Sequence, residues 1–132
     1  MIFLDTSAVV ALLDRRDSEH ERAKKAWKKA NREALVTTDL VLAEIVTLLR
    51  RRVGFEAACA AGERFLSGSV AEIRYADSPL MGQAWTFFER YDDQELSLTD
   101  CVSFALMKER RIRQAFAFDQ DFRTAGFELI RG

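Results

Sequence analysis

Four acidic residues of this chain follow or interrupt apolar segments, where an unpaired carboxylate is costly to bury. Most of its 21 acidic residues instead lie among lysines and arginines on charged segments, where solvation explains them. Carboxylates brought together would repel one another and raise one another's pKa unless a cation joins them. Oxygen-only ligands select hard divalent ions such as Mg²⁺ or Mn²⁺, which support phosphoryl chemistry with water as the nucleophile. The four residues are Asp5, Glu44, Asp100 and Asp119.

Alternating strand-like and helix-like segments must position these acids. Short runs rich in β-branched and aromatic residues alternate with longer amphipathic segments, without a break that would mark a second domain. This alternation predicts a single α/β domain over residues 1–132, with a mostly parallel central sheet of about five strands flanked by helices. The expected strands are 2–4, 34–37, 70–75, 115–118 and 127–130; the expected helices are 6–14, 17–32, 40–52, 55–66, a helix starting near 79, 97–110 and a short turn or helix from 121.

The alternation brings the four acids to one edge of the sheet. Asp5 and Asp119 each end an apolar strand, and parallel strands end at the same edge, where open α/β sheets bind ligands. Asp100 lies in the first turn of a helix that starts at this edge, and Glu44 lies one turn into another. Each acid also has a plainer interpretation, as a turn residue, a helix cap or a half-exposed side chain.

Two further residues near the strand ends are expected to cap helices. Thr6 follows Asp5 and is expected to be the N-cap of the first helix. Asp121, two residues after Asp119, is well placed to cap the short helix that follows it. Asp119 is therefore the preferred ligand at this strand, although Asp121 could share or take its role.

Composition and motifs exclude several other classes. The chain is 48% hydrophobic and 31% charged with a net charge of −1, which is typical of a globular domain and not of a disordered chain. No apolar run approaches the roughly 18 residues of a membrane span, and the first residues lack a signal-peptide pattern, so we expect a cytoplasmic protein with no membrane partner. Cys59 and Cys101 are expected to be reduced, buried thiols. The single histidine, His20, is expected at the surface, which excludes a Ser-His-Asp or Cys-His site, and no phosphate-binding glycine motif occurs.

Four stretches, in chain order, resemble the motifs of PIN-domain ribonucleases, and specifically of the small VapC-type toxins of toxin–antitoxin pairs. Together they span almost the entire chain. The resemblance implies a three-layer PIN-like fold, and it places the acidic quartet of the family on the four acids selected above. The stretches are IFLDTSA at 2–8, TDLVLAE at 38–44, LTDC at 98–101 and AFDQDF at 117–122.

The resemblance implies a cofactor, an activity and partners. It implies endonucleolytic cleavage of RNA phosphodiesters by water that Mg²⁺ or Mn²⁺ activates, with Asp5 and Asp100 as the leading metal ligands. The hydroxyl position that the family keeps beside the site falls on Thr6 or Ser7, and on Thr99. The implied partners are the RNA substrate, a second copy of the chain in a homodimer and a cognate antitoxin that obstructs the site.

Three alternatives were weighed against this interpretation. A receiver-like phosphoacceptor domain needs adjacent acids after the first strand and a lysine at the end of a late strand, and both are absent. A haloacid-dehalogenase-type phosphatase needs a second Asp two residues after the first, where Ser7 stands. A catalytically silent PIN-fold binding module would lack one or more of the acids, and all four are present.

Basic runs occur at 24–29, 50–52 and 110–113. Such runs are usually solvated faces, yet an enzyme with an acidic site and a net charge of −1 must still attract phosphates. Arg50–Arg52 end the helix of Glu44, about 10 Å from that residue at 1.5 Å per residue and away from the site edge. Four helically spaced aromatic residues are assigned to core or dimer packing instead of base stacking: Trp27, Trp85, Phe87 and Phe88.

Overall fold

A parallel five-stranded sheet forms the centre of the molecule. The computed structural model describes residues 1–130. Its strands are β1 (Ile2–Leu4), β2 (Leu35–Thr38), β3 (Glu72–Arg74), β4 (Gln114–Phe116) and β5 (Glu128–Leu129). Its helices are α1 (Thr6–Leu13), α2 (His20–Ala30), α3 (Asp39–Arg52), α4 (Phe55–Leu66), α5 (Ser78–Arg90), α6 (Leu98–Glu109) and α7 (Asp121–Thr124).

The strand order is β3-β2-β1-β4-β5, and each pair of neighbours is parallel. β1 lies in the middle, with Phe3 opposite Val36 of β2 on one side and opposite Ala115 of β4 on the other. All three residues of β1 are buried, as expected for a parallel strand covered on both faces. The sequence prediction of an α/β fold with about five mostly parallel strands is confirmed.

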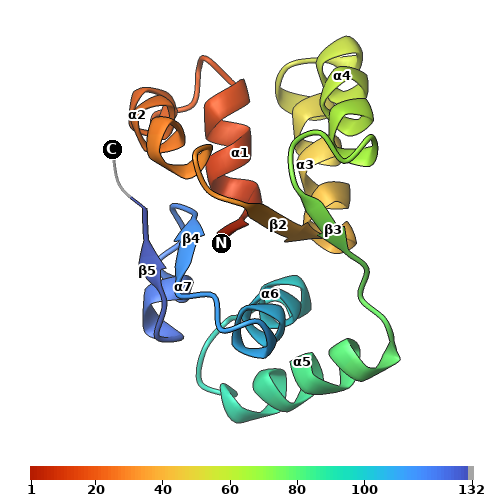
Figure 1. The fold of residues 1–132 in the computed structure, drawn as a ribbon, viewed down its shortest axis with the longest axis vertical. Helices are drawn as coiled ribbons and strands as arrows, with labels where there is room; N and C mark the ends of the chain where they lie inside the picture. Colours follow the sequence, from red (N-terminus) through yellow and green to blue (C-terminus); the bar gives the residue numbers. More distant parts are fainter. Residues whose placement is uncertain (131–132) are drawn as a thin grey trace.

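The order of the strands explains why the helices form two layers. The chain moves outward from β1 to β2 to β3, then returns across the sheet to β4 and continues to β5. Right-handed crossovers place helices on opposite faces when this direction reverses. Accordingly, α1 to α4 lie on one side of the sheet, above it in Figure 1, and α5 to α7 lie on the other.

Three buried phenylalanines connect the sheet to the second helical layer. Phe122 of α7 packs against Phe3 of β1, with ring centroids 6.1 Å apart, and edge-on against Phe104 of α6 at 5.0 Å. Fully burying one such side chain contributes about 1.5–3 kcal/mol. Phe122 thereby anchors the short α7 and the turn before it, which carries two of the candidate acids.

Several helix and strand ends differ from the sequence prediction. The side chain of Asp5, and not that of Thr6, caps α1, because it accepts the backbone N–H of Ser7 at 3.2 Å. β4 ends at Phe116, so Asp119 lies in the connection that follows the strand instead of ending it. Thr38 and Ser97 do cap α3 and α6, where their hydroxyls accept backbone N–H groups.

Smaller expectations have mixed outcomes. Cys101 is buried and Cys59 is half-buried, and both are free thiols. His20, expected at the surface, is half-buried, and its Nδ1 lies 2.8 Å from the carbonyl oxygen of Ala11. Trp27 packs against Phe116, with ring centroids 5.6 Å apart, whereas Trp85 remains 51% exposed. Within residues 1–130, none of the helices combines the length and apolar composition that crossing a bilayer requires.

Candidate metal centre

The candidate acids lie where the direction of the chain across the sheet reverses. β1 connects to β2 on one side and pairs with the late strand β4 on the other. The crevice outside the carboxyl ends of two such strands is the usual ligand site of open α/β sheets. Asp5 follows β1, Asp119 lies in the connection after β4, and Asp100 occupies the first turn of α6.

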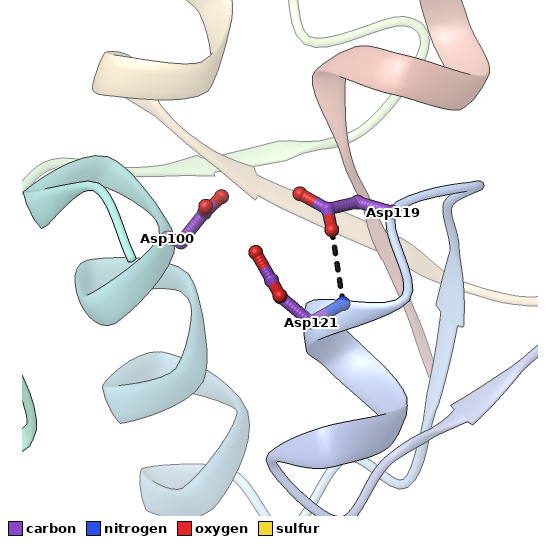
Figure 2. A group of neighbouring side chains, drawn as sticks. All are labelled: Asp100, Asp119 and Asp121. Atoms are coloured by element: carbon purple, nitrogen blue, oxygen red, sulfur yellow. Dashed lines mark hydrogen bonds between the residues drawn. The ribbon is translucent and has the colours of Figure 1, made fainter. Parts of the chain in front are cut away.

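Three carboxylates meet at this point. Asp100, Asp119 and Asp121 each offer an oxygen atom within 4.8 Å of the others. Figure 2 shows the side chain of Asp100 reaching from α6 toward the two aspartates of the β4–α7 turn, whose carboxylates point back toward it. All three side chains are half-buried. Residues far apart in the sequence therefore form one acidic cluster.

The hydrogen bonds of Asp119 and Asp121 differ from the expectation that Asp121 caps the short helix and Asp119 is the ligand. Oδ1 of Asp119 accepts the backbone N–H of Asp121 at 2.9 Å, so Asp119 closes the turn that opens α7. Asp121 is the first residue of α7 and makes no capping hydrogen bond, because Gln120 is the N-cap residue. Its carboxylate is consequently available to the cluster, as Figure 2 shows. The D-x-D spacing across a turn is the sequence signal for this pair, and the sharing of the site by Asp119 and Asp121 is the alternative that the sequence left open.

Asp5 lies near the cluster, where its charge acts on Asp100, and it is held by Ser7. It is only 4% exposed, and its Oδ2 accepts both the hydroxyl of Ser7 at 2.6 Å and the backbone N–H of the same residue. The hydroxyl oxygen of Ser7 in turn accepts the backbone N–H of Phe118 at 3.0 Å. Ser7 thus connects the end of β1 to the segment that carries Asp119. The sequence indicates Ser7 as a hydroxyl beside the site, but it carries no signal for this link across 111 residues.

Glu44 is held at the same edge by the neighbouring hydroxyl. The Thr6 hydroxyl donates to Oε1 of Glu44 at 2.6 Å, which ties α3 to the start of α1. Thr99, the other hydroxyl residue named from the sequence, is half-buried beside Asp100, and its carbonyl accepts the hydroxyl of Ser103 at 3.2 Å. Asp5 and Glu44 are therefore outside the group of three carboxylates, each with an oxygen engaged by a hydroxyl donor.

The electrostatics of the site are those of crowded carboxylates. Burial, together with the charges of Asp5, Asp119 and Glu44, raises the pKa of Asp100 from its ordinary 3.8 to about 7, and burial is the largest of these causes. Burial also raises the pKa of Asp5 to about 6, against the hydrogen bonds from Ser7 and with a contribution from Asp119. The pKa of Asp121 is raised by burial and by the charge of Asp119.

This donor set fits a hard divalent cation. Carboxylate oxygens are the ligands that Mg²⁺ and Mn²⁺ prefer, and one or two carboxylates commonly suffice for Mg²⁺ when water and phosphate complete its shell. Burial and the repulsion among the carboxylates both raise the pKa of Asp100, and a bound cation would offset both effects by favouring the charged carboxylate. Asp100, Asp119 and Asp121 can contact one ion directly, whereas Asp5 and Glu44 lie close enough to act on Asp100 through their charge.

The fold and the acidic crevice together define a class of protein. A model of the PIN domain family matches residues 2–128, and the chain belongs to this family. Among curated proteins it is 41% identical over 131 residues to the 23S rRNA-specific endonuclease VapC20 of Mycobacterium tuberculosis, a match that covers 99% of this chain and 98% of that protein. The VapC-type relationship expected from the sequence is confirmed. Ribonuclease VapC26 of the same organism is 28% identical over 119 residues, 90% of this chain and 87% of that one.

Solved structures agree with these relationships. The crystal structure of Mycobacterium tuberculosis VapC20, described as a Sarcin-Ricin loop cleaving toxin, superimposes with a TM-score of 0.92 and 39% identity over the whole of both chains. FitAcB from Neisseria gonorrhoeae has a TM-score of 0.74 at 17% identity, covering 98% of this chain and 96% of that one. At that identity, the second likeness shows the fold alone.

Proposed function

We propose that this chain is a single-domain endoribonuclease that depends on Mg²⁺ or Mn²⁺ and acts in the cytoplasm as the toxin of a toxin–antitoxin pair. The observation that carries the proposal is the convergence of Asp100, Asp119 and Asp121 in the crevice between β1 and β4. Nuclease activity in the VapC relatives supports it, since VapC20 is an endonuclease and VapC26 a ribonuclease by name. The choice between the two metals rests on the all-oxygen donor set alone.

The chain's own residues position and charge the site. A divalent cation held by the three aspartates would supply a Lewis acid for the scissile phosphate and would make a water molecule a competent nucleophile. Ser7 fixes Asp5 and the segment before Asp119, and Thr6 fixes Glu44, so both hydroxyls orient acids instead of reacting. Hydrolysis by water is the chemistry that a cation held by these carboxylates can support.

We propose ribosomal RNA as the substrate class, and the sarcin–ricin loop of 23S rRNA in particular. The support is the 41% identity to VapC20 over nearly the whole of both chains together with the names given to that protein. A relationship of this length makes a different substrate class unexpected, because no segment large enough to form another recognition surface is added or lost.

The proposed partners are a cognate antitoxin and a second copy of the chain. The antitoxin is supported by the VapBC2 structure from Rickettsia felis, which has a TM-score of 0.69 at 16% identity, covers 98% of this chain and 97% of that chain, and is described as bound to a DNA fragment from the promoter. The homodimer rests on the family resemblance. Exposed aromatic rings on α5, where Trp85 stacks on Phe88 with centroids 5.2 Å apart, provide a surface suited to such contact.

Expression in bacteria tests this proposal, with ribosomal RNA as the readout. The intact chain should arrest growth, and primer extension on 23S rRNA should show one new end within the sarcin–ricin loop. Asp100→Asn should do neither, and the antitoxin encoded by the neighbouring gene should restore growth to the wild type. Growth arrest with intact 23S rRNA would remove the substrate assignment, and harmless expression would remove the toxin assignment. RNA binding without any cleavage would instead favour the catalytically silent binding module.

A further inference from the structure

Five arginines gather at the end of α3 that lies farthest from the acidic crevice. The connection between α1 and α2 contacts the last turn of α3 there, because the guanidinium of Arg16 donates to the carbonyl of Arg52 and Arg52 pairs with Asp17 at 3.1 Å. Figure 1 shows this connection and the α3–α4 turn at the same end of the molecule, above the sheet. We call this surface the arginine end; it consists of Arg15, Arg16, Arg50, Arg51 and Arg52.

Stabilisation of the C-terminal end of α3 does not explain why all five arginines are present. Cations are favoured near a helix C-terminus, and one hydrogen bond to a terminal carbonyl satisfies much of that requirement. Arg16 already makes that bond, and Arg52 is held by Asp17. Among the residues that the structure describes, Arg15, Arg50 and Arg51 form no ion pair, and all three are exposed. Arg15 and Arg51 are therefore free to meet a ligand, and Arg50 has no ion pair that would neutralise its charge.

An exposed aromatic ring lies within the same surface. Phe55, the first residue of α4, is 61% exposed, and the guanidinium of Arg50 stacks over its ring at 4.9 Å from the centroid. Such a phenylalanine costs free energy in water and contributes little to the core. A planar cation on an aromatic ring, next to unpaired arginines, is the combination that binds phosphates and stacks unpaired bases in nucleic-acid-binding proteins.

We propose that the arginine end and Phe55 form a second RNA-contacting surface, which holds a part of the substrate outside the crevice. This inference rests on the proposed ribonuclease function. An acidic crevice on a chain of net charge −1 repels RNA until a cation is bound, so attraction must come from elsewhere on the surface. α3 connects the two sites, because Arg51 lies seven residues beyond Glu44, or about 10 Å along the helix axis.

An acidic segment of a protein partner is the main competing ligand. It would engage the arginines through carboxylates but would not need the exposed ring of Phe55. Unpaired bases use both features, and the RNA proposal therefore explains one more observation. A protein ligand is kept as an outcome of the test.

The test uses variants that remove charge without removing a structural bond. Arg15→Ala/Arg51→Ala deletes two exposed, unpaired cations and leaves Arg16 and Arg52 in place. Phe55→Ala deletes the ring. Lys25→Ala/Lys28→Ala on α2 is the matched control, because it removes the same charge from an exposed face where neither lysine has an ion pair among the described residues. The probes are a sarcin–ricin hairpin RNA and a tetranucleotide, which offers far fewer phosphates and bases outside the cleavage site.

For the hairpin, we expect the arginine double variant to raise KM about tenfold with kcat unchanged, and to lower the dependence of log KM on log salt by about 1.5, as expected for two lost phosphate contacts. Phe55→Ala should raise KM about fivefold with an unchanged salt slope, which corresponds to one lost stacking contact. Tetranucleotide cleavage and the lysine control should match the wild type. Equal effects of the arginine and lysine variants on the hairpin would overturn the proposal, as would weakened antitoxin binding with hairpin kinetics unchanged.

A binding measurement separates this inference from the proposed activity. Fluorescence anisotropy of the labelled hairpin with the full-length chain carrying Asp100→Asn reports RNA binding whether or not the chain cleaves RNA. If the arginine double variant weakens binding in this background, the surface stands even if the nuclease assignment fails. Unchanged binding there would reject the surface and leave the nuclease assignment untouched.

Discussion

At the scale of single residues, Ser7 contributes more than its position beside Asp5 indicates. Its hydroxyl donates to Asp5 and accepts from the backbone of Phe118, so one oxygen atom joins two segments that are 111 residues apart. No other side chain replaces either hydrogen bond. Removal of this hydroxyl should consequently disturb both Asp5 and the turn that carries Asp119.

We therefore predict that Ser7→Ala lowers kcat for RNA cleavage by about 10- to 100-fold, the usual effect of losing a residue that orients ligands. KM should change little, and the divalent-ion concentration for half-maximal activity should rise. Ser103→Ala is the control, because that hydroxyl is buried but bonds only a carbonyl within α6. Equal losses in the two variants would assign the effect of Ser7 to stability instead of positioning.

The crowded carboxylates also predict how stability depends on pH. The folded-state pKa values of Asp5 and Asp100 are about 6 and about 7, above the ordinary value of 3.8. Between the ordinary and the folded values the folded chain binds more protons than the unfolded chain, so the free energy of unfolding falls as pH rises. This loss in the free energy of unfolding is absent below pH ~4 and complete above pH ~7.

In EDTA, we expect a higher melting temperature at about pH 5.5 than at about pH 8, and a smaller difference for Asp100→Asn. Saturating Mg²⁺ should raise the melting temperature more at the higher pH, because deprotonated carboxylates bind the ion. Thermal unfolding with and without Mg²⁺ measures both effects. A metal-free protein whose stability rises with pH over this range would show that the carboxylates do not crowd one another as described.

At the scale of the elements, the residue that follows the C-cap of α6 has a strained backbone conformation. Arg111 has a φ of 55°, in the left-handed region that favours glycine. The N–H of Ile112 bonds the carbonyl of Met107 at 2.8 Å, and the N–H of Arg111 bonds that of Lys108 at 3.2 Å, the two bonds of a Schellman motif. An arginine thus occupies the position that is usually glycine in this motif.

Arg111→Gly should raise the free energy of unfolding by about 0.5–1 kcal/mol, because relief of the left-handed strain exceeds the added entropy of the unfolded chain. Arg113→Gly removes the same charge where φ is not positive, and should lower stability by a similar amount. Urea unfolding compares the two variants. Destabilisation by both would show that the conformation of Arg111 is not strained.

The comparison of sequence and structure is most instructive at these element ends. The existence and order of the strands and helices followed from apolar patterning, and the range of α4 was predicted to the residue. The ends around the site were less predictable. Asp5 and Thr6 are both good caps, and only the packing of β1 decides that Asp5 occupies the N-cap. β4 ends where its pairing with β1 ends, at Phe116 opposite Leu4, and local sequence does not encode that register.

The same limit applies to the candidate site. Strand–helix alternation predicted that Asp5, Glu44, Asp100 and Asp119 reach one edge, and the structure places them there. The sequence could not show which of these carboxylates lie closest to one another, because those distances depend on rotamers and on side-chain hydrogen bonds between distant segments. The bond from Thr6 to Glu44 spans 38 residues and that from Ser7 to Phe118 spans 111. The hydroxyls of Thr6 and Ser7 engage Glu44 and Asp5, whereas the carboxylate of Asp121 lies with those of Asp100 and Asp119.

At the scale of the whole molecule, the fold separates repulsive and attractive charge. The reversal of chain direction between β1 and β4 gathers the carboxylates in one crevice, and α3 carries the arginines to its far end. A cation that joins the carboxylates lowers the cost of bringing RNA phosphate to them. The assignment of catalytic residues remains a prediction, and it depends on whether these carboxylates act through a metal.

The most direct measurement is hydrolysis of the sarcin–ricin hairpin by the wild type, Asp100→Asn and Asp93→Asn during titration with Mg²⁺ and Mn²⁺. Asp93 is exposed on the connection between α5 and α6 and is the control for loss of one carboxylate. We predict that the wild type and Asp93→Asn cleave only when a divalent ion is present, and that Asp100→Asn loses at least about 100-fold in kcat/KM while it melts no lower than the wild type. Undiminished cleavage in EDTA, or by Asp100→Asn, would contradict a metal-dependent site built from these acids.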